Sequence, residues 1–234
     1  MNLHILGCDG TYPGPEGATS GYLVSHGGRH LLLDCGSGVM SRLLAKLKPE
    51  DLSAICLTHW HNDHVADMLA MKYYCQIQKK RLRVMIPKEG HELQDFLAGD
   101  EFEYLEYDQK TEIDGFVIEA LRVWHPIPAY AMKITAGGKT LIYTGDLVGG
   151  EGLTLFCRGA DLLLCDGAFT KAEWNHHLPH FSASQAGQLA TAAQVKKLVI
   201  THAQPGRDKA LLLKEAKEQF ENTIQAENGL SLSL

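Results

Sequence analysis

Short apolar runs alternate with amphipathic segments along the chain. Runs of this length that are rich in leucine, isoleucine and valine predict β-strands. The strands predicted in this way are residues 3–8, 21–26, 30–35, 54–59, 82–86, 116–124, 129–136, 139–145, 161–166 and 197–202. Gly27-Gly28 and Gly137-Gly138 each separate two of these runs, which predicts two tight hairpins.

Segments with helical spacing lie between the strands. One is "SGVMSRLLAKL" (37–47), and two further helices are predicted from Ser182 to about Ala193 and from about Arg207 to Phe220. One helix face is predicted from the spacing i, i+3, i+4, i+8 and i+12 of Val65, Met68, Leu69, Tyr73 and Ile77. Adjacent strands favour antiparallel pairing in the first half, and the later alternation favours strands covered by helices. We therefore expect a mixed α/β sandwich with helices on its outer faces.

Composition places the chain among ordinary globular proteins. It has 234 residues, 45% hydrophobic and 21% charged, enough for one large domain or two small ones. We find no signal peptide and no membrane-length apolar run. The six cysteines are scattered without C-x-x-C spacing, which favours reduced thiols in a cytoplasmic protein.

The charge balance does not favour a long nucleic acid as partner. The formal net charge is −6, whereas proteins that grip a phosphate backbone usually carry a basic stripe. The basic run Lys79–Arg83 is interpreted as a solvated helix end that leads into a strand.

The strongest chemical feature is "LTHWHNDH" (57–64), between a predicted strand and a helix. It places His59, His61, Asp63 and His64 within six residues. Imidazole and carboxylate ligands suit zinc, manganese or iron. His59 and His61, two apart in extended chain, can face one metal, while Asp63 and His64 can turn toward a second.

Three more candidate ligands follow strands elsewhere in the chain. They are His125 in "RVWHPIPAY", Asp146 in "YTGDL" and His202 in "VITHAQPG". Each alone could be a satisfied histidine or a turn aspartate. Together they would complete two sites of four or five ligands with room for water.

These residues resemble the metallo-β-lactamase-fold hydrolases, whose H-x-H-x-D-H motif stands here as "HWHNDH". The resemblance covers nearly the whole chain. It implies a single domain over residues 1–234, folded as an αββα four-layer sandwich of two mixed β-sheets with outer helices. By position, His59, His61 and His125 would hold one metal, Asp63, His64 and His202 the other, and Asp146 would bridge them. Asp34 in "LLLDCGSG" matches an early aspartate that supports the ligand loop.

The resemblance implies two divalent metal ions, with Zn²⁺ expected and Mn²⁺ or Fe²⁺ as alternatives. The implied chemistry is hydrolysis by a metal-bound hydroxide. No Ser or Cys nucleophile is needed, and the chain has no "G-x-S-x-G".

Within this family the chain resembles the ribonuclease Z-like branch. The segments that carry the resemblance are "LGCDGTYPGPEGATSGYLV", "LLLDCGSG" and "HPIPAYAMKI". In that branch a histidine before a helix acts on the leaving group, and an acidic residue orients it. His180 in "PHFSASQAG" and Asp166 in "LLLCDGAF" match these positions, although the branch usually has glutamate at the second.

Local physics supports His180 as the candidate general acid. Ser182 and Gln185 have the spacing of a capping box, which would place His180 directly before a helix. A carboxylate at Asp166 would hold one imidazole tautomer and favour its protonated form. The candidate catalytic residues are therefore His180, Asp166 and Asp63, whereas His176 and His177 are interpreted as exposed residues near the site mouth.

The resemblance also bears on the substrate. The tRNA-processing members carry a long arm inserted in the domain. Here only 20 residues separate His125 from Asp146, and their pattern predicts a hairpin. We therefore expect a small phosphodiester, cyclic or nucleotide-derived, rather than tRNA, with no membrane partner and with a homodimer suggested by the branch.

Other functions remain open at this point. An acyl hydrolase acting on a lactone, thioester or lactam would use the same metals without needing His180. A diiron redox protein would carry a carboxylate in place of His61 and an attached flavin domain. A non-catalytic binding module would be expected to lack a ligand, and every expected ligand is present.

Overall fold

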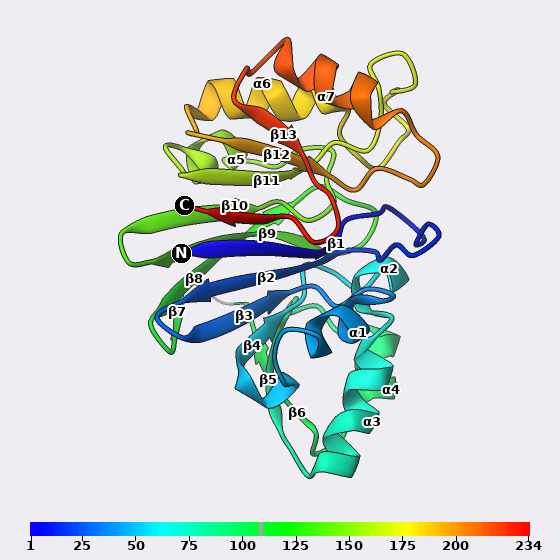
Figure 1. Cartoon of the computed structure of the whole chain (residues 1–234), viewed down its shortest axis with the longest axis vertical. Coiled ribbons are helices and arrows are strands. Elements are labelled where there is room, and N and C mark those ends of the chain that lie inside the picture. The colour runs from blue at the N-terminus through cyan, green and yellow to red at the C-terminus, as the bar shows by residue number, and fades with distance from the viewer. Residues whose placement is uncertain (108–109) are drawn as a thin grey trace.

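Two seven-stranded mixed β-sheets face each other between outer helices (Figure 1). The computed structural model describes residues 1–107 and 110–234. The first sheet has the order β14-β1-β2-β3-β4-β5-β6, with strands Ser231–Ser233, Asn2–Gly7, Gly21–His26, Arg29–Leu33, Leu52–Cys56, Leu82–Ile86 and Phe102–Glu106. The second has the order β13-β12-β11-β10-β9-β8-β7, with strands Thr223–Gln225, Leu198–Thr201, Leu162–Asp166, Lys139–Tyr143, Ala129–Ala136, Phe116–Val123 and Lys110–Ile113.

Strand pairing changes from antiparallel to parallel within each sheet. In the first sheet β1, β2 and β3 pair antiparallel, and β3 to β6 pair parallel. In the second, β7 to β10 pair antiparallel, and β10 to β13 pair parallel. The hairpins predicted at Gly27-Gly28 and Gly137-Gly138 are confirmed, and all four glycines have the positive φ that such two-residue turns require.

Helices cover the outer face of each sheet (Figure 1). On the first sheet lie α1, α3 and α4, and on the second lie α5, α6 and α7. The helices are α1 Val39–Leu44, α2 Asn62–Val65, α3 Met68–Gln78, α4 Glu92–Leu97, α5 Leu153–Cys157, α6 Ala183–Ala193 and α7 Lys209–Lys217, with a 3₁₀ turn at Pro49–Asp51. The basic run Lys79–Arg83 does lead from the end of α3 into β5.

Buried side chains form three apolar layers. One layer lies between the sheets, one beneath α5 to α7, and one beneath α1, α3 and α4. Three layers are what four stacked elements require, because each sheet buries both faces. The predicted αββα sandwich is therefore confirmed. That residues 1–234 form a single folding domain stays a prediction.

The predicted helix face over 65–77 is wrong in part. The segment is broken into α2 and α3, and α3 buries Met68, Met71 and Cys75. Leu69, Tyr73 and Ile77 are instead exposed, at 50%, 66% and 62%. The buried positions of α3 have the spacing i, i+3 and i+7, which is a different face from the predicted one.

Several elements had no clear pattern in the sequence. They are the short or edge elements α4, α5, β6, β7, β13 and β14. The predicted helix over 207–220 is shorter than expected, since α7 spans Lys209–Lys217. It begins after Asp208, which caps it by accepting the Leu211 backbone N–H.

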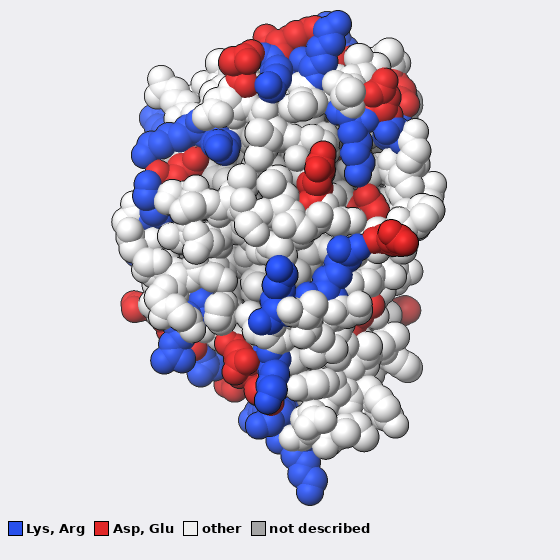
Figure 2. Space-filling model, in the orientation of Figure 1, with Lys and Arg blue, Asp and Glu red and all other residues white. Residues whose placement is uncertain are grey.

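On the face shown in Figure 2, basic and acidic side chains are interspersed. Among the described residues, no helix is long and apolar enough to cross a membrane. All six cysteines are free and buried.

Candidate metal centre

The predicted ligands converge because each follows the carboxyl end of a strand. The segment after β4 carries four of them, with His59 and His61 in the loop and Asp63 and His64 in the short helix α2. His125 follows β8, Asp146 follows β10 and His202 follows β12. The loop after β10 passes close to the loop after β4 at Gly145, which has a φ of +57°. A Cβ at Gly145 would lie 2.8 Å from Cβ of Thr58, so only glycine permits this approach.

One cluster brings together His59, His61, His125 and Asp146. Nδ1 of His61 lies 3.0 Å from Nε2 of His59 and 3.0 Å from Nε2 of His125. Nε2 of His59 is 3.6 Å from Oδ2 of Asp146. Three imidazole nitrogens and one carboxylate oxygen thus surround one point, a donor set that divalent first-row metals accept.

A second cluster brings together Asp63, His64, His202 and Asp146. Nε2 of His64 lies 3.3 Å from Oδ1 of Asp146, and Nε2 of His202 lies 3.4 Å from Oδ2 of the same carboxylate. Oδ2 of Asp63 is 3.6 Å from Nε2 of His202. Asp146 belongs to both clusters, which is the position that a bridging ligand would need.

Two orphaned nitrogens show that these residues fit a cation. Nε2 of His64 and Nε2 of His202 are buried and have no hydrogen-bond partner among the described residues. A buried polar atom without a partner costs free energy, and both atoms face carboxylate oxygens of Asp146 across 3.3–3.4 Å. A divalent cation between them would satisfy both nitrogens.

Asp34 supports the second cluster from beneath. It is fully buried after β3, and its Oδ2 accepts hydrogen bonds from Nδ1 of His64 at 2.7 Å and from the Tyr143 hydroxyl at 2.8 Å. Its Oδ1 accepts from the Thr58 backbone N–H at 2.7 Å. With Nδ1 of His64 donating to Asp34, Nε2 is left as the ligand atom.

Three of the other four candidate ligand histidines also have a partner at Nδ1. His59 Nδ1 lies 2.9 Å from Thr58 Oγ1, His125 Nδ1 donates to the Pro179 carbonyl at 3.1 Å, and His202 Nδ1 lies 3.3 Å from Ser20 Oγ. The Thr11 backbone N–H donates to Oδ2 of Asp63 at 2.9 Å. Of these supports the sequence indicated only Asp34, because an isolated Thr, Ser or carbonyl has no pattern of its own.

Two residues of the candidate metal centre have strained backbone conformations. Asp34 and His202 have φ values of +57° and +67°, in the left-handed region that residues other than glycine rarely adopt. Strained residues persist where the surrounding structure holds them, and they gather at functional sites.

The first-cluster histidines are held in the neutral form that binds metals. Burial lowers the pKa of His59 well below its ordinary value, and it lowers that of His125 to about 4. His64 differs, because the carboxylates of Asp146 and Asp34 outweigh its burial and raise its pKa. A cation at the second cluster must therefore displace a proton from His64.

His180 lies beside both clusters and contacts Asp166 as the sequence predicted. Nδ1 of His180 is 2.9 Å from Oδ2 of Asp166 and 3.8 Å from Oδ2 of Asp146. The capping box is confirmed, since Ser182 Oγ accepts the Gln185 N–H and the Gln185 side chain accepts the Ser182 N–H. Asp166 ends β11, and its oxygens also accept the backbone N–H groups of Leu147 and Ala168.

Electrostatics favours a protonated His180. Burial lowers its pKa, but the carboxylates of Asp166 and Asp146 raise it by more, to about 9. With Nδ1 engaged by Asp166, Nε2 is the nitrogen free to transfer a proton. His176 and His177 are exposed, as expected, and belong to neither cluster.

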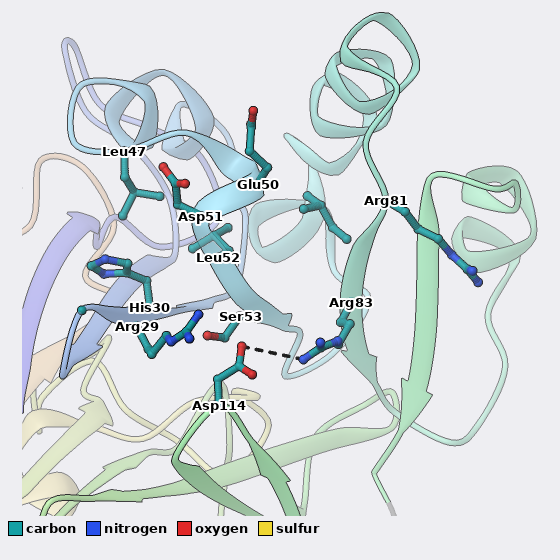
Figure 3. Close-up of a pocket in the computed structure, with 12 residues that line it drawn as sticks. Arg29, His30, Leu47, Glu50, Asp51, Leu52, Ser53, Arg81, Arg83 and Asp114 are labelled. Carbon is teal, nitrogen blue, oxygen red and sulfur yellow. Dashed lines mark ion pairs between the residues drawn. The ribbon is translucent and has the colours of Figure 1, made fainter.

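A separate cavity of about 500 Å³ lies at the opposite ends of the strands. Its residues begin β3, β4 and β5, and in Figure 3 Arg83 pairs with Asp114 across the cavity at 3.8 Å. Three arginines are balanced by Glu50, Asp51 and Asp114, so its chemistry favours no ligand of one charge. It contains no residue of the clusters above.

Comparison with known proteins agrees with this geometry. The family model described as "Beta-lactamase superfamily domain" matches residues 29–203. The protein "Probable metallo-hydrolase YhfI" of Bacillus subtilis is 32% identical, over 96% of this chain and 96% of its own length. Its crystal structure, described as a metallo-beta-lactamase fold protein, superposes with a TM-score of 0.92 and 30% identity, covering 99% of this chain and 98% of that chain.

A second relative is longer than this chain. "Ribonuclease Z" of Archaeoglobus fulgidus is 27% identical, over all of this chain and 98% of its own length. That alignment extends over 301 positions, against the 234 residues here, so the relative carries inserted segments. The crystal structure of the short form of human tRNase Z has the same fold, with a TM-score of 0.81 at 21% identity over 100% of this chain and 99% of that chain.

Proposed function

The chain belongs to the β-lactamase superfamily and is a metal-dependent hydrolase, and from that premise we propose that it is a phosphodiesterase of small, cyclic or nucleotide-derived phosphodiesters. The observation that carries the proposal is the pair of His180 and Asp166, at 2.9 Å, beside the two ligand clusters. An acyl hydrolase could act with the metals alone, whereas a phosphodiester with an alkoxide leaving group needs a proton donor.

The proposed ligands are those of the two clusters, with Asp146 shared. Divalent cations held there would lower the pKa of a water molecule and stabilise charge on the phosphoryl oxygens. We propose Zn²⁺ as the resident metal, with Mn²⁺ or Fe²⁺ as the alternatives that metal analysis would distinguish. Asp63, held by the Thr11 N–H, is proposed as a ligand and as a catalytic carboxylate.

His180 is proposed to protonate the leaving oxygen through Nε2. Asp166 accepts from Nδ1 and so fixes the ring orientation and keeps the proton on the imidazole at neutral pH. Trp174 Nε1 donates to the His180 carbonyl at 2.9 Å, and the Ser182 cap fixes the chain two residues later. The proton donor is thus oriented by contacts on both sides.

We propose a small substrate because the segment between His125 and Asp146 is too short to hold a long RNA-binding arm. Between His125 and Asp146 it forms the hairpin of β9 and β10. YhfI aligns over 237 positions, close to the length of this chain, while the ribonuclease Z alignment includes inserted segments. The net charge of −6 supports the same proposal. A homodimer stays a prediction from the resemblance, which light scattering would test.

One metal-loaded sample assayed on two substrate panels tests the proposal. We expect turnover of bis(p-nitrophenyl) phosphate, which Asp146→Asn should abolish by weakening both metal sites. Turnover of lactones or thioesters without phosphodiester turnover, at full metal occupancy, would establish the acyl hydrolase instead.

A further inference from the structure

A cavity of about 520 Å³ opens beside the candidate metal centre. Its lining comes from the segment around Trp124 and His125, from Val148, and from the segment that carries His176, His177 and Pro179. His125 is shared with the first ligand cluster. The cavity therefore adjoins the first ligand cluster at His125.

Trp124 presents an unusually exposed indole to the cavity. Its side chain is 60% exposed, whereas Trp60 is 2% exposed. The ring nevertheless has a fixed support, because a Cβ at Gly149 would lie only 2.8 Å from Cε3 of Trp124. The backbones are joined as well, by hydrogen bonds from Trp124 N–H to the Gly149 carbonyl at 2.8 Å and from Val148 N–H to the Trp124 carbonyl at 2.9 Å.

This support makes the indole a preorganised platform. Gly149, which has no side chain, lies against one part of the indole ring. The exposed part of the ring lines the cavity. An exposed tryptophan leaves a large apolar surface in water. A supported one beside a candidate active site is therefore a candidate for contact with a ligand. In complexes with single-stranded nucleic acids, bases stack favourably on such rings.

A second segment of the lining leads to the proposed proton donor. His176 and His177 have adjacent rings, with centroids 3.9 Å apart, on the segment that leads to His180. In the same segment the Pro179 carbonyl accepts from Nδ1 of His125 at 3.1 Å. A group bound in the cavity would therefore contact the segment that orients both a metal ligand and the general acid.

Arg122 also lines the cavity but is already paired. Its guanidinium forms an ion pair with Glu89, whose carboxylate also accepts from the Tyr130 hydroxyl at 3.0 Å. The free surface of the cavity is thus aromatic, imidazole and aliphatic, which suits a flat, uncharged ring.

We propose that this cavity is a subsite for a planar aromatic group of the substrate, such as a nucleobase, which stacks on Trp124 while the phosphate lies at the ligand clusters. The proposal rests on the proposed phosphodiesterase function and narrows its substrate to nucleotide-derived diesters. His176 and His177 form the rim of the subsite.

Binding of adenosine 5′-monophosphate and of ribose 5-phosphate tests the subsite, because the two ligands differ only in the base. Calorimetry on zinc-loaded protein should show the nucleotide binding on the order of tenfold more tightly, as about 1.4 kcal/mol of stacking implies. This advantage should disappear in Trp124→Ala and largely persist in Trp124→Phe. Tyr73→Ala, which removes an equally exposed aromatic on α3, should keep it.

An advantage that is absent in the wild type, or unchanged in Trp124→Ala, would overturn the subsite. Kinetics with thymidine 5′-(p-nitrophenyl phosphate) gives a second measurement, in which Trp124→Ala should raise KM on the order of tenfold with little change in kcat. Base-dependent binding without any diester turnover would refute the phosphodiesterase and leave the subsite standing. Diester turnover without base-dependent binding would refute the subsite and leave the phosphodiesterase standing.

Discussion

Nδ1 of His180 lies 2.9 Å from Oδ2 of Asp166, and both residues are buried at the carboxyl ends of the second sheet. The carboxylate outweighs the effect of burial and, with Asp146, raises the pKa of His180 to about 9. Cations at the neighbouring clusters would lower this value, since they repel the imidazolium charge. A group that must be protonated to act loses activity as pH rises through its pKa.

Asp166→Asn should therefore move the alkaline limb of kcat to lower pH. The substitution removes the negative charge that raises the pKa of His180, so the imidazole loses its proton at lower pH. The measurement is a pH profile of kcat between pH 6 and 10 for a phosphodiester with an alkyl leaving group, at constant zinc occupancy. Asp161→Asn, whose carboxylate pairs with Lys196 at the opposite end of β11, should leave the profile in place. An unmoved limb in Asp166→Asn would exclude this role.

His180→Gln should reduce phosphodiester turnover on the order of 10²–10⁴-fold while retaining the metals. Glutamine keeps a polar side chain of similar reach but cannot donate an acidic proton. Metal content by mass spectrometry of the purified protein, measured together with kcat, separates the two effects. A substrate with a very acidic leaving phenol should be affected less than an alkyl diester, and equal losses on both would contradict proton donation.

Metal analysis should find two ions per chain, with unequal consequences when single ligands are removed. His202→Ala removes a ligand of the second cluster only, so about one ion should remain. Asp146→Asn alters a ligand of both clusters and should weaken both sites. Chelation should lower the melting temperature, because a cation that binds only the folded state stabilises it. One ion in the wild type would contradict the bridging role of Asp146.

The sequence predicts the sandwich and the clustering of the candidate ligands, because both depend on local patterns. Buried strands have apolar runs, and ligands follow strand ends, as the HWHNDH segment does after β4. Edge elements such as β13 and β14 are three residues long, too short for a periodic pattern. The predicted face of α3 is wrong because apolar side chains occur on both of its faces, and packing buries Met68, Met71 and Cys75 rather than Leu69, Tyr73 and Ile77.

Apart from Asp34, the residues that orient the candidate ligands could not be predicted from the sequence. Thr58, Ser20 and the Pro179 carbonyl orient ligand histidines through contacts that span up to 182 residues of sequence. Such residues have no spacing rule that relates them to their ligands. The role of Trp124 likewise depends on Gly149, which lies against it only after β8 and the loop beyond β10 have come together.

Ser182→Ala should destabilise the fold by about 1 kcal/mol, the usual effect of losing an N-cap. It should also reduce kcat, because the cap fixes the chain two residues after His180. Urea denaturation and steady-state kinetics measure the two effects. Asp208→Ala removes the corresponding cap of α7 and provides the control, since it should reduce stability by a similar amount with kcat retained. Equal effects on kcat in both variants would mean that the cap of α6 acts only through stability.

Asp34→Asn should weaken metal binding at the second cluster by about 10–100-fold, the typical effect of removing a carboxylate behind a ligand histidine. The buried carboxylate accepts from Nδ1 of His64, from Thr58 and from Tyr143, whereas an amide must offer its NH₂ to at least one of these donors. The competing chelator concentration that removes half of the zinc measures the change. Asp95→Asn, an exposed position on α4, is the matched control. The loss should be confined to one of the two ions, because His64 belongs only to the second cluster, and equal weakening of both sites would show that Asp34 supports the whole loop rather than His64.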